Sequence, residues 1–200
     1  MSSFVLSLAW AICSKSYIIS YMKQILFIRH AESTVNNGDV AFGNLEAPLT
    51  QKALEVQIPN TKNELFEKYG ITPDRCDKLV AVSLYRRACQ TAEALGFKNI
   101  NQLEILNESQ IYNDGELKGV DVIKKHVSEN GWLPERELER ARQIIKEIQD
   151  GNLNQEIFVS HGMVIAGVIS ELNRLGLADV PFDAKRGYVP LQAQVTCVNL

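Results

Sequence analysis

The stretch QILFIRH, residues 24–30, decides the fold of this 200-residue chain. Its first five residues, 24–28, form a short apolar run rich in β-favouring side chains, and Arg29 and His30 follow at the carboxyl end of that run. An uninterrupted apolar run of this length is typical of a strand that is buried on both faces. Such strands occur in parallel sheets whose two faces are covered by helices, so the stretch predicts the first strand of an α/β fold.

The rest of the chain alternates between strand and helix patterns. Apolar runs predict further strands at 78–82, 103–106, 156–159 and 195–198, and 3.6-residue periodicity or good helix formers predict helices from Thr50 to about Tyr69 and over 86–95, about 120–129, 135–149 and 163–175. Pro59 is expected to kink or split the first helix, and residues 31–48 are expected to form a loop. This alternation predicts a three-layer α/β/α domain over residues 22–200, with a mostly parallel central sheet and a short cap insertion at about 109–134.

Composition excludes several classes of function. The chain has 21 basic and 24 acidic residues, a net charge of −3, which makes it a poor non-specific binder of nucleic acid. Its three histidines form no cluster and its four cysteines form no Cys-x-x-Cys pair, so we expect no structural metal site. The scattered cysteines indicate reduced thiols and therefore a cytoplasmic protein.

Residues 1–21 differ from the remainder of the chain. They contain one charged residue, Lys15, and an apolar run at 4–13 that is too short to cross a membrane. No basic segment precedes that run, as a signal peptide would require. Because Met22 leads directly into the first strand, we interpret residues 1–21 as an upstream mis-start or a dispensable leader. The alternatives are an extra packed element, or a signal or anchor, which would export the protein or bring it to a membrane.

Chemically reactive side chains follow the carboxyl ends of four predicted strands, where parallel sheets bind their ligands. They are Arg29 and His30, residues 83–87, Glu108 and His161. Taken singly, each has an ordinary explanation as a surface or core residue. Together they suit phosphoryl transfer, which needs a neutral imidazole as nucleophile, guanidinium groups around the phosphoryl oxygens and an acid for the leaving group. The sequence contains no phosphate-binding loop of the P-loop or Rossmann type, and we expect no cofactor.

Five segments carry a resemblance. They are RHAESTVN at 29–36, APLT at 47–50, SLYRRACQTAE at 83–93, LNE at 106–108 and VSHG at 159–162. In this order they resemble the signatures R-H-G-x-[ST]-x-x-N, P-L-T, S-P-L-x-R-A-x-Q-T-A-E, L-x-E and S-H-G of the histidine phosphatase superfamily, in its phosphoglycerate mutase-like branch. Ala31, Leu84 and Ala53 replace a glycine, a proline and a glycine of the family pattern. These replacements concern loop geometry, and a position that requires positive φ would be strained by Ala31.

The resemblance implies a role for each matched residue. His30 would be the nucleophile and form a phosphohistidine, Glu108 would protonate the leaving alcohol and then activate water, and the phosphoryl oxygens would be held by Arg29, Arg87 and His161. Further phosphate or substrate contacts would come from Asn36, Ser33, Thr50 and Gly162. No metal is implied. Arg86 is expected to face solvent or to support the site indirectly, because consecutive helix residues point about 100° apart. His126 is expected to be a solvated helix residue.

The residues that follow the predicted acid favour a phosphatase over a mutase. Phosphoglycerate mutases of the family carry an arginine directly after the acid and an Asn-Lys pair further on, whereas this chain has Ser109 and Asp121-Val122 at those places. The contacts that would retain a phosphorylated intermediate are therefore missing or displaced. We predict hydrolysis of a small phosphorylated metabolite. The alternatives are a mutase-type phosphotransferase, a phosphohistidine protein phosphatase and a catalytically dead binding module.

Overall fold

The computed structural model describes residues 23–38, 44–108, 129, 133–177 and 191–200. The leader at 1–21, His126 and most of the cap insertion lie outside these residues, as does the helix expected at about 120–129 except for its last position. The strands are β1 (Gln24–Arg29), β2 (Val80–Val82), β3 (Ile100–Gln102), β4 (Ile157–Ser160) and β5 (Val195–Asn199). The α-helices are α2 (Ile58–Tyr69), α3 (Arg86–Leu95), α5 (Glu135–Gln149) and α6 (Gly162–Arg174). None of the helices in the described part of the chain is both long and apolar enough to cross a lipid bilayer.

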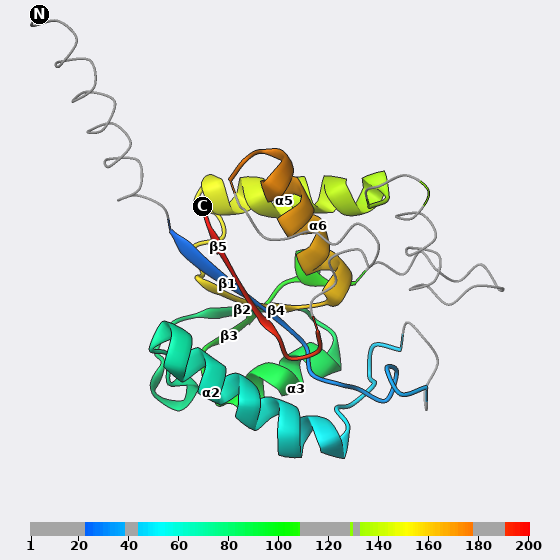
Figure 1. The fold of residues 1–200 in the computed structure, drawn as a ribbon, viewed down its shortest axis with the longest axis vertical. Coiled ribbons are helices and arrows are strands. Elements are labelled where there is room, and N and C mark those ends of the chain that lie inside the picture. Colours follow the sequence, from blue (N-terminus) through cyan, green and yellow to red (C-terminus); the bar gives the residue numbers. More distant parts are fainter. Residues whose placement is uncertain (1–22, 39–43, 109–128, 130–132, 178–190) are drawn as a thin grey trace, which may run out of the picture.

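The five strands form one sheet in the order β3-β2-β4-β1-β5 (Figure 1). β1 pairs in parallel with β4, with Leu26 opposite Ile157, and β2 pairs in parallel with both β4 and β3. Only β5 runs antiparallel, along the free edge of β1. The prediction of a mostly parallel sheet is therefore confirmed, and β1 occupies an interior position that explains its uninterrupted apolar run.

Helices cover both faces of the sheet, as a three-layer architecture requires. On one face α2 and α3 pack over a core that includes Leu26 and Ile28, and on the other α5 and α6 pack over a core that includes Ile25 and Phe27 (Figure 1). Successive side chains of a strand point to opposite faces of the sheet, and both faces are covered by helices. All four of these β1 side chains are therefore buried. Burial of each stabilises the fold by about 1.5–3 kcal/mol.

The prediction of a third strand at 103–106 is wrong. The strand is β3, Ile100–Gln102, and a single 3₁₀ turn, η3, follows it at Glu104–Leu106. β3 is an edge strand bonded only to β2, so it tolerates the polar side chains of Asn101 and Gln102. Because of these polar residues, a search for apolar runs does not detect the strand. The apolar signal came instead from Leu106, which is fully buried against the core from within the 3₁₀ turn.

The first helix begins as expected, but it is not split at Pro59: the backbone is helical on both sides of the junction between η1 and α2. The Thr50 hydroxyl oxygen accepts a hydrogen bond from the amide of Ala53 at 3.2 Å, which is how an N-cap satisfies a free helical N–H. A π-helical segment, η1 (Ala53–Gln57), precedes α2, and Pro59 lies in the first turn of α2. A proline lacks the N–H that an α-helical hydrogen bond needs. The change from π-helical to α-helical hydrogen bonding therefore lies next to Pro59, where one such bond is missing in any case.

Candidate active site

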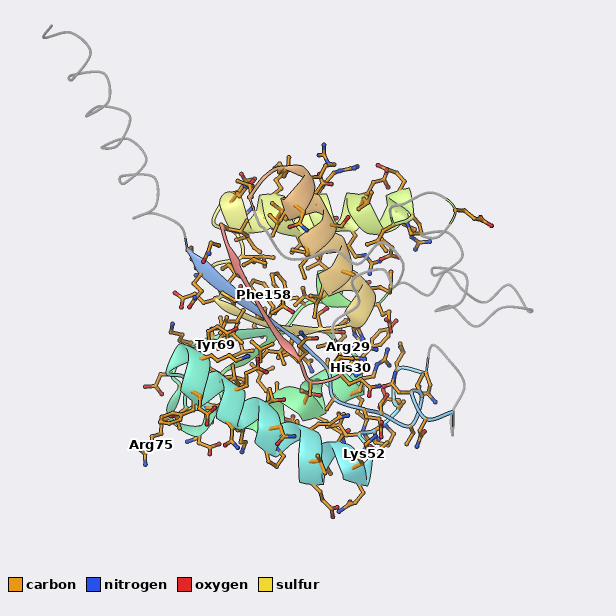
Figure 2. All side chains as sticks on the ribbon, in the orientation of Figure 1. Arg29, His30, Lys52, Tyr69, Arg75 and Phe158 are labelled. Carbon is orange, nitrogen blue, oxygen red and sulfur yellow. The ribbon has the colours of Figure 1, made fainter. Side chains whose placement is uncertain are left out.

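The order of the strands brings the predicted site residues together. β2, β4 and β1 are consecutive neighbours in the sheet, and Ser83, His161 and His30 follow their respective carboxyl ends. Glu108 follows the 3₁₀ turn after β3, which borders β2 on its other side. Four adjacent parallel strands therefore deliver side chains to one end of the sheet, where Figure 2 labels Arg29 and His30.

His30 is buried and its ring is oriented by a backbone contact. Its Nδ1 lies 2.7 Å from the carbonyl oxygen of Ala31, and because a carbonyl only accepts, Nδ1 carries the proton. Nε2 therefore carries the lone pair, and it accepts a hydrogen bond from Nε of Arg87 at 3.3 Å. Burial, together with the positive charges of Arg87 and Arg29, holds the pKa of His30 well below its ordinary value. His30 thus presents the neutral Nε2 that a nucleophile requires.

Arg87, on the first turn of α3, connects three parts of the site. Besides His30, its guanidinium donates to Oε2 of Glu108 at 2.9 Å and to the carbonyl oxygen of Asn44 at 3.1 Å. The guanidinium also lies 4.7 Å from the centre of the Tyr85 ring, within the range of a cation–π contact. Its neighbour Arg86 is exposed, as predicted from the helical geometry.

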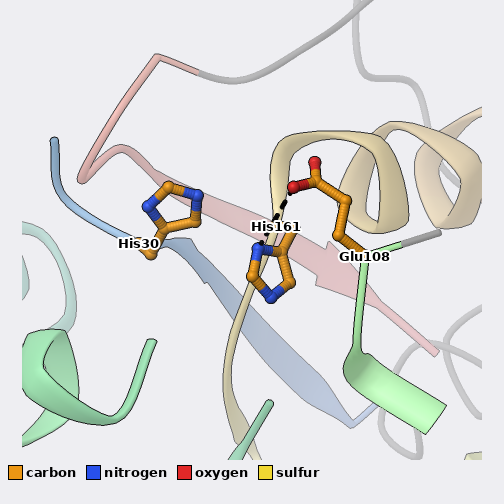
Figure 3. A group of neighbouring side chains, drawn as sticks. All are labelled: His30, Glu108 and His161. Atoms are coloured by element: carbon orange, nitrogen blue, oxygen red, sulfur yellow. Dashed lines mark ion pairs between the residues drawn. The ribbon is translucent and has the colours of Figure 1, made fainter. Parts of the chain in front are cut away.

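His161 and Glu108 lie together on one side of His30 (Figure 3). Oε2 of Glu108 lies 3.6 Å from Nδ1 of His161, and the two imidazole rings are 5.0 Å apart between centroids. The Tyr85 ring packs edge-on against His161 at 4.9 Å, and the Tyr85 hydroxyl donates to the carbonyl oxygen of Glu108 at 3.1 Å. We call His30, Arg87, Glu108 and His161 the central cluster.

The central cluster suits an anion better than a metal ion. Ligand atoms of His30, Glu108 and His161 lie within 4.8 Å of one another, a spacing that a cation spans in other proteins. Here, however, the same Nε2 of His30 and Oε2 of Glu108 already accept hydrogen bonds from Arg87. A fixed positive charge between the ligand atoms opposes a cation and favours an oxyanion, which guanidinium groups bind in a planar, bidentate way.

The other predicted binding residues lie around the central cluster rather than in it. Arg29, half-buried at the end of β1, acts on His30 and Glu108 through its charge, and Gly162 opens α6 directly after His161. Oδ1 of Asn36 accepts hydrogen bonds from the amide and the hydroxyl of Ser33. Thr50 caps the first helix and donates to Glu32. Among the described residues, no hydrogen bond or ion pair joins Ser33, Asn36 or Thr50 to the central cluster.

Three residues that contact the central cluster directly or through one another had been given no role from the sequence. They are Ser83, whose Oγ lies 2.8 Å from Nε2 of His161, Asn107, whose Oδ1 accepts from that hydroxyl at 2.8 Å, and Tyr85. All three fall inside the motif segments at 83–93 and 106–108. The motif segments therefore contain residues that meet in the structure, but they do not separate the central cluster from the residues around it.

Comparison with solved structures supports the fold. A phosphoserine phosphatase from Entamoeba histolytica, solved with 3-phosphoglyceric acid, superposes with a TM-score of 0.62 at 19% identity, over 88% of this chain and 90% of that one. A putative α-ribazole-5′-phosphate phosphatase from Escherichia coli gives a TM-score of 0.58 at 20% identity, over 88% and 89%. A mycobacterial glucosyl-3-phosphoglycerate phosphatase gives 0.56 at 18% identity, over 88% and 90%.

Sequence comparison identifies the family. A search of curated protein sequences gave no match. The sequence profile of the histidine phosphatase superfamily (branch 1) matches residues 25–184. The match starts inside β1 and extends past α6, so it includes every member of the central cluster. The chain belongs to the histidine phosphatase superfamily, branch 1.

Proposed function

We propose that this protein is a phosphatase that hydrolyses phosphomonoesters through a phosphohistidine formed on His30. One observation carries the proposal: Nδ1 of His30 donates to a backbone carbonyl, so the lone pair of Nε2 is directed at the guanidinium of Arg87. A neutral, oriented nitrogen beside a fixed phosphate-binding cation is the arrangement that nucleophilic phosphoryl transfer needs.

In the first step Nε2 of His30 attacks phosphorus, and the bond between phosphorus and the alcohol oxygen breaks. Arg87 and Arg29 neutralise the charge on the phosphoryl oxygens. Glu108 gives its proton to the departing oxygen, which leaves as a neutral alcohol. The products are a phosphorylated His30 and a Glu108 carboxylate.

In the second step water attacks the phosphohistidine, and Glu108 takes the proton of that water. The bond between nitrogen and phosphorus breaks, and its electron pair returns to Nε2 of His30. Inorganic phosphate leaves and the resting state is restored. Glu108 suits both steps because it lies against Arg87 and His161, beside the nitrogen that carries the phosphoryl group.

The family and the site both support a small-molecule substrate. The three solved structures compared above are named for phosphatases of small molecules: phosphoserine, α-ribazole phosphate and glucosyl-3-phosphoglycerate. Arg87, Arg29 and the two imidazoles recognise a phosphoryl group without reference to the rest of the molecule. We therefore propose a small phosphorylated metabolite as substrate.

The test is hydrolysis of p-nitrophenyl phosphate by the full chain. The proposal expects turnover that survives EDTA, and a phosphoenzyme that is labile in acid and stable in base after rapid quenching. His30→Ala should lose both the turnover and the phosphoenzyme, whereas His126→Ala, at a histidine outside the described residues, should keep them. Full activity in His30→Ala would contradict the mechanism, and an intact wild-type chain that hydrolyses no phosphomonoester would indicate a binding module. Migration of phosphate on phosphoglycerate with little free phosphate released would indicate a mutase.

A further inference from the structure

A chain of hydrogen bonds behind His161 determines which of its nitrogens carries the proton. The Leu84 amide donates to Oδ1 of Asn107 at 2.9 Å, which identifies that atom as the oxygen of the side-chain amide. The same Oδ1 lies 2.8 Å from Oγ of Ser83, and because it only accepts, the single hydroxyl proton of Ser83 is donated to it.

With its proton committed to Asn107, Ser83 has only acceptor capacity left. Its oxygen accepts from the amide of Tyr85 at 3.2 Å, and Nε2 of His161 lies 2.8 Å away. Nε2 must therefore be the donor in that contact. Ser83 and His161 are both fully buried, so a hydroxyl or an imidazole turned the wrong way would leave a buried polar atom without a partner, which is unfavourable.

The nitrogen of His161 that remains is Nδ1, on the side of Glu108 and His30. It is buried and has no hydrogen-bond partner among the described residues, with Oε2 of Glu108 at 3.6 Å. In the neutral Nε2–H form, Nδ1 carries a lone pair and cannot donate to a phosphoryl oxygen. His161 donates from Nδ1 only as the doubly protonated imidazolium.

We propose that Asn107 and Ser83 are positioning residues that fix His161 in its Nε2–H form, so that His161 must take up a proton when an oxyanion binds beside it. The inference rests on the proposed function only in placing the oxyanion at the central cluster. It goes beyond that function because it assigns a proton uptake to binding, before any bond is broken.

The charges around His161 support uptake on binding rather than before it. Among the residues that the structure describes, the titratable and charged groups that face it are Arg29 from β1 and His30 directly after it, Tyr85 and Arg87 from the β2–α3 segment, Glu108 after η3 and Arg140 from α5. Burial and the cationic and imidazole members of this group hold the pKa of His161 well below its ordinary value, so His161 is neutral before an anion binds. A doubly charged oxyanion supplies the opposite charge and favours the imidazolium.

The experiment measures the pH dependence of tungstate binding by calorimetry, because tungstate is a dianion that carries no proton of its own at neutral pH. Coupled uptake of one proton weakens binding about tenfold for each unit of rising pH, and transfers roughly one proton per site from the buffer. In Ser83→Ala the constraint is gone, and neutral His161 is free to place its proton on Nδ1. We expect binding to persist in that variant with most of the pH dependence lost.

Thr91→Val is the matched control. Thr91 is another buried hydroxyl beside the site, but it bonds the amide of Ala31 and the carbonyl of Arg87 rather than His161. This variant should keep the tenfold dependence. Asn107→Ala should behave like Ser83→Ala, since it frees the Ser83 proton to turn toward His161. Equal pH dependence in wild type and Ser83→Ala, with both folded, would overturn the proposal.

A second measurement needs no variant. Nitrogen-15 NMR of labelled histidine in the free wild-type chain should show His161 neutral with its proton on Nε2, and doubly protonated with tungstate bound. A proton on Nδ1 in the free protein would overturn the proposal. If tungstate does not bind and p-nitrophenyl phosphate is not hydrolysed, the proposed function fails, and the tautomer of free His161 still decides this inference.

Discussion

Replacing Arg87 by lysine tests the role of geometry in the site separately from the role of charge. The planar guanidinium of Arg87 reaches His30, Glu108 and the carbonyl of Asn44 at once, at 3.3, 2.9 and 3.1 Å. A lysine keeps the positive charge but presents it as one compact ammonium group on a shorter chain. A single nitrogen cannot reproduce the planar fork that spans all three partners, so the nucleophile and the acid are held less firmly in place.

The size of the effect follows from the hydrogen bonds that a lysine cannot make. Under the proposed mechanism Arg87 turns at least one of its donors to the phosphoryl group in the transition state. Loss of one preorganised donor of this kind costs about 2.7–4 kcal/mol of transition-state stabilisation. At about 1.4 kcal/mol for each factor of ten, Arg87→Lys should lower kcat for p-nitrophenyl phosphate by about 100- to 1000-fold.

Arg86→Lys is the control, since it makes the same substitution one residue away. The Arg86 side chain is exposed, and its one described hydrogen bond, to the carbonyl of Glu46, is long at 3.5 Å. This variant should stay within about threefold of wild-type kcat, because no described hydrogen bond or ion pair joins the Arg86 side chain to the central cluster, and its free energy of unfolding should change by no more than about 0.5 kcal/mol. Steady-state kinetics and urea unfolding of both variants provide the measurement. A folded Arg87→Lys protein within fivefold of wild type, or an equal loss in Arg86→Lys, would refute this reasoning.

Three further outcomes are expected. Glu108→Gln should lower kcat by at least about 100-fold while phosphate still binds, and a matching loss of phosphate affinity would count against its acid role. Because the pKa values of His30 and His161 are lowered and both are neutral when folded, the unfolded chain binds more protons, so the free energy of unfolding should fall as pH drops below about 6.5; a urea midpoint that stays constant through this range would disagree. A shortened chain beginning at Met22 should fold and remain active, since Lys23 already pairs with Leu200 through two backbone hydrogen bonds and the family match begins at residue 25; an insoluble or inactive product would disprove it.

Sequence patterns predicted the interior strands and the edge strand β5, but they missed the other edge strand, β3. β1 and β4 are buried on both faces and bonded on both sides, so each shows a continuous apolar run. β3 lies at the edge and carries polar residues, and its apolar neighbours form a 3₁₀ turn instead. A pattern of burial identifies buried residues, but it does not say whether the backbone that buries them is a strand.

The members of the central cluster were easier to find from the sequence than the residues that contact them. His30, Glu108 and His161 carry distinctive chemistry and follow strand ends, whereas Ser83 and Asn107 are common polar residues whose bond joins positions 24 apart in sequence. Nothing local distinguishes a serine that fixes a tautomer from one on the surface. The backbone conformation of Ala31 was likewise not predictable from the sequence. Ala31 does not have the positive φ that would strain an alanine, because the only described residue other than glycine with positive φ is Ala193.

The hydrogen bonds of Arg87 also connect substrate binding to the acid. The same guanidinium that would bind a phosphoryl group is bonded to Oε2 of Glu108. Under the proposed mechanism an incoming phosphoryl oxygen competes with Glu108 for that donor, and the stronger negative charge of the phosphoryl group favours the exchange. Glu108 is then released toward the leaving oxygen only when substrate is bound. Before it can act as the proton donor, the Glu108 carboxylate that pairs with Arg87 in the free protein takes up one proton, which a phosphomonoester monoanion or the solvent supplies when the substrate binds.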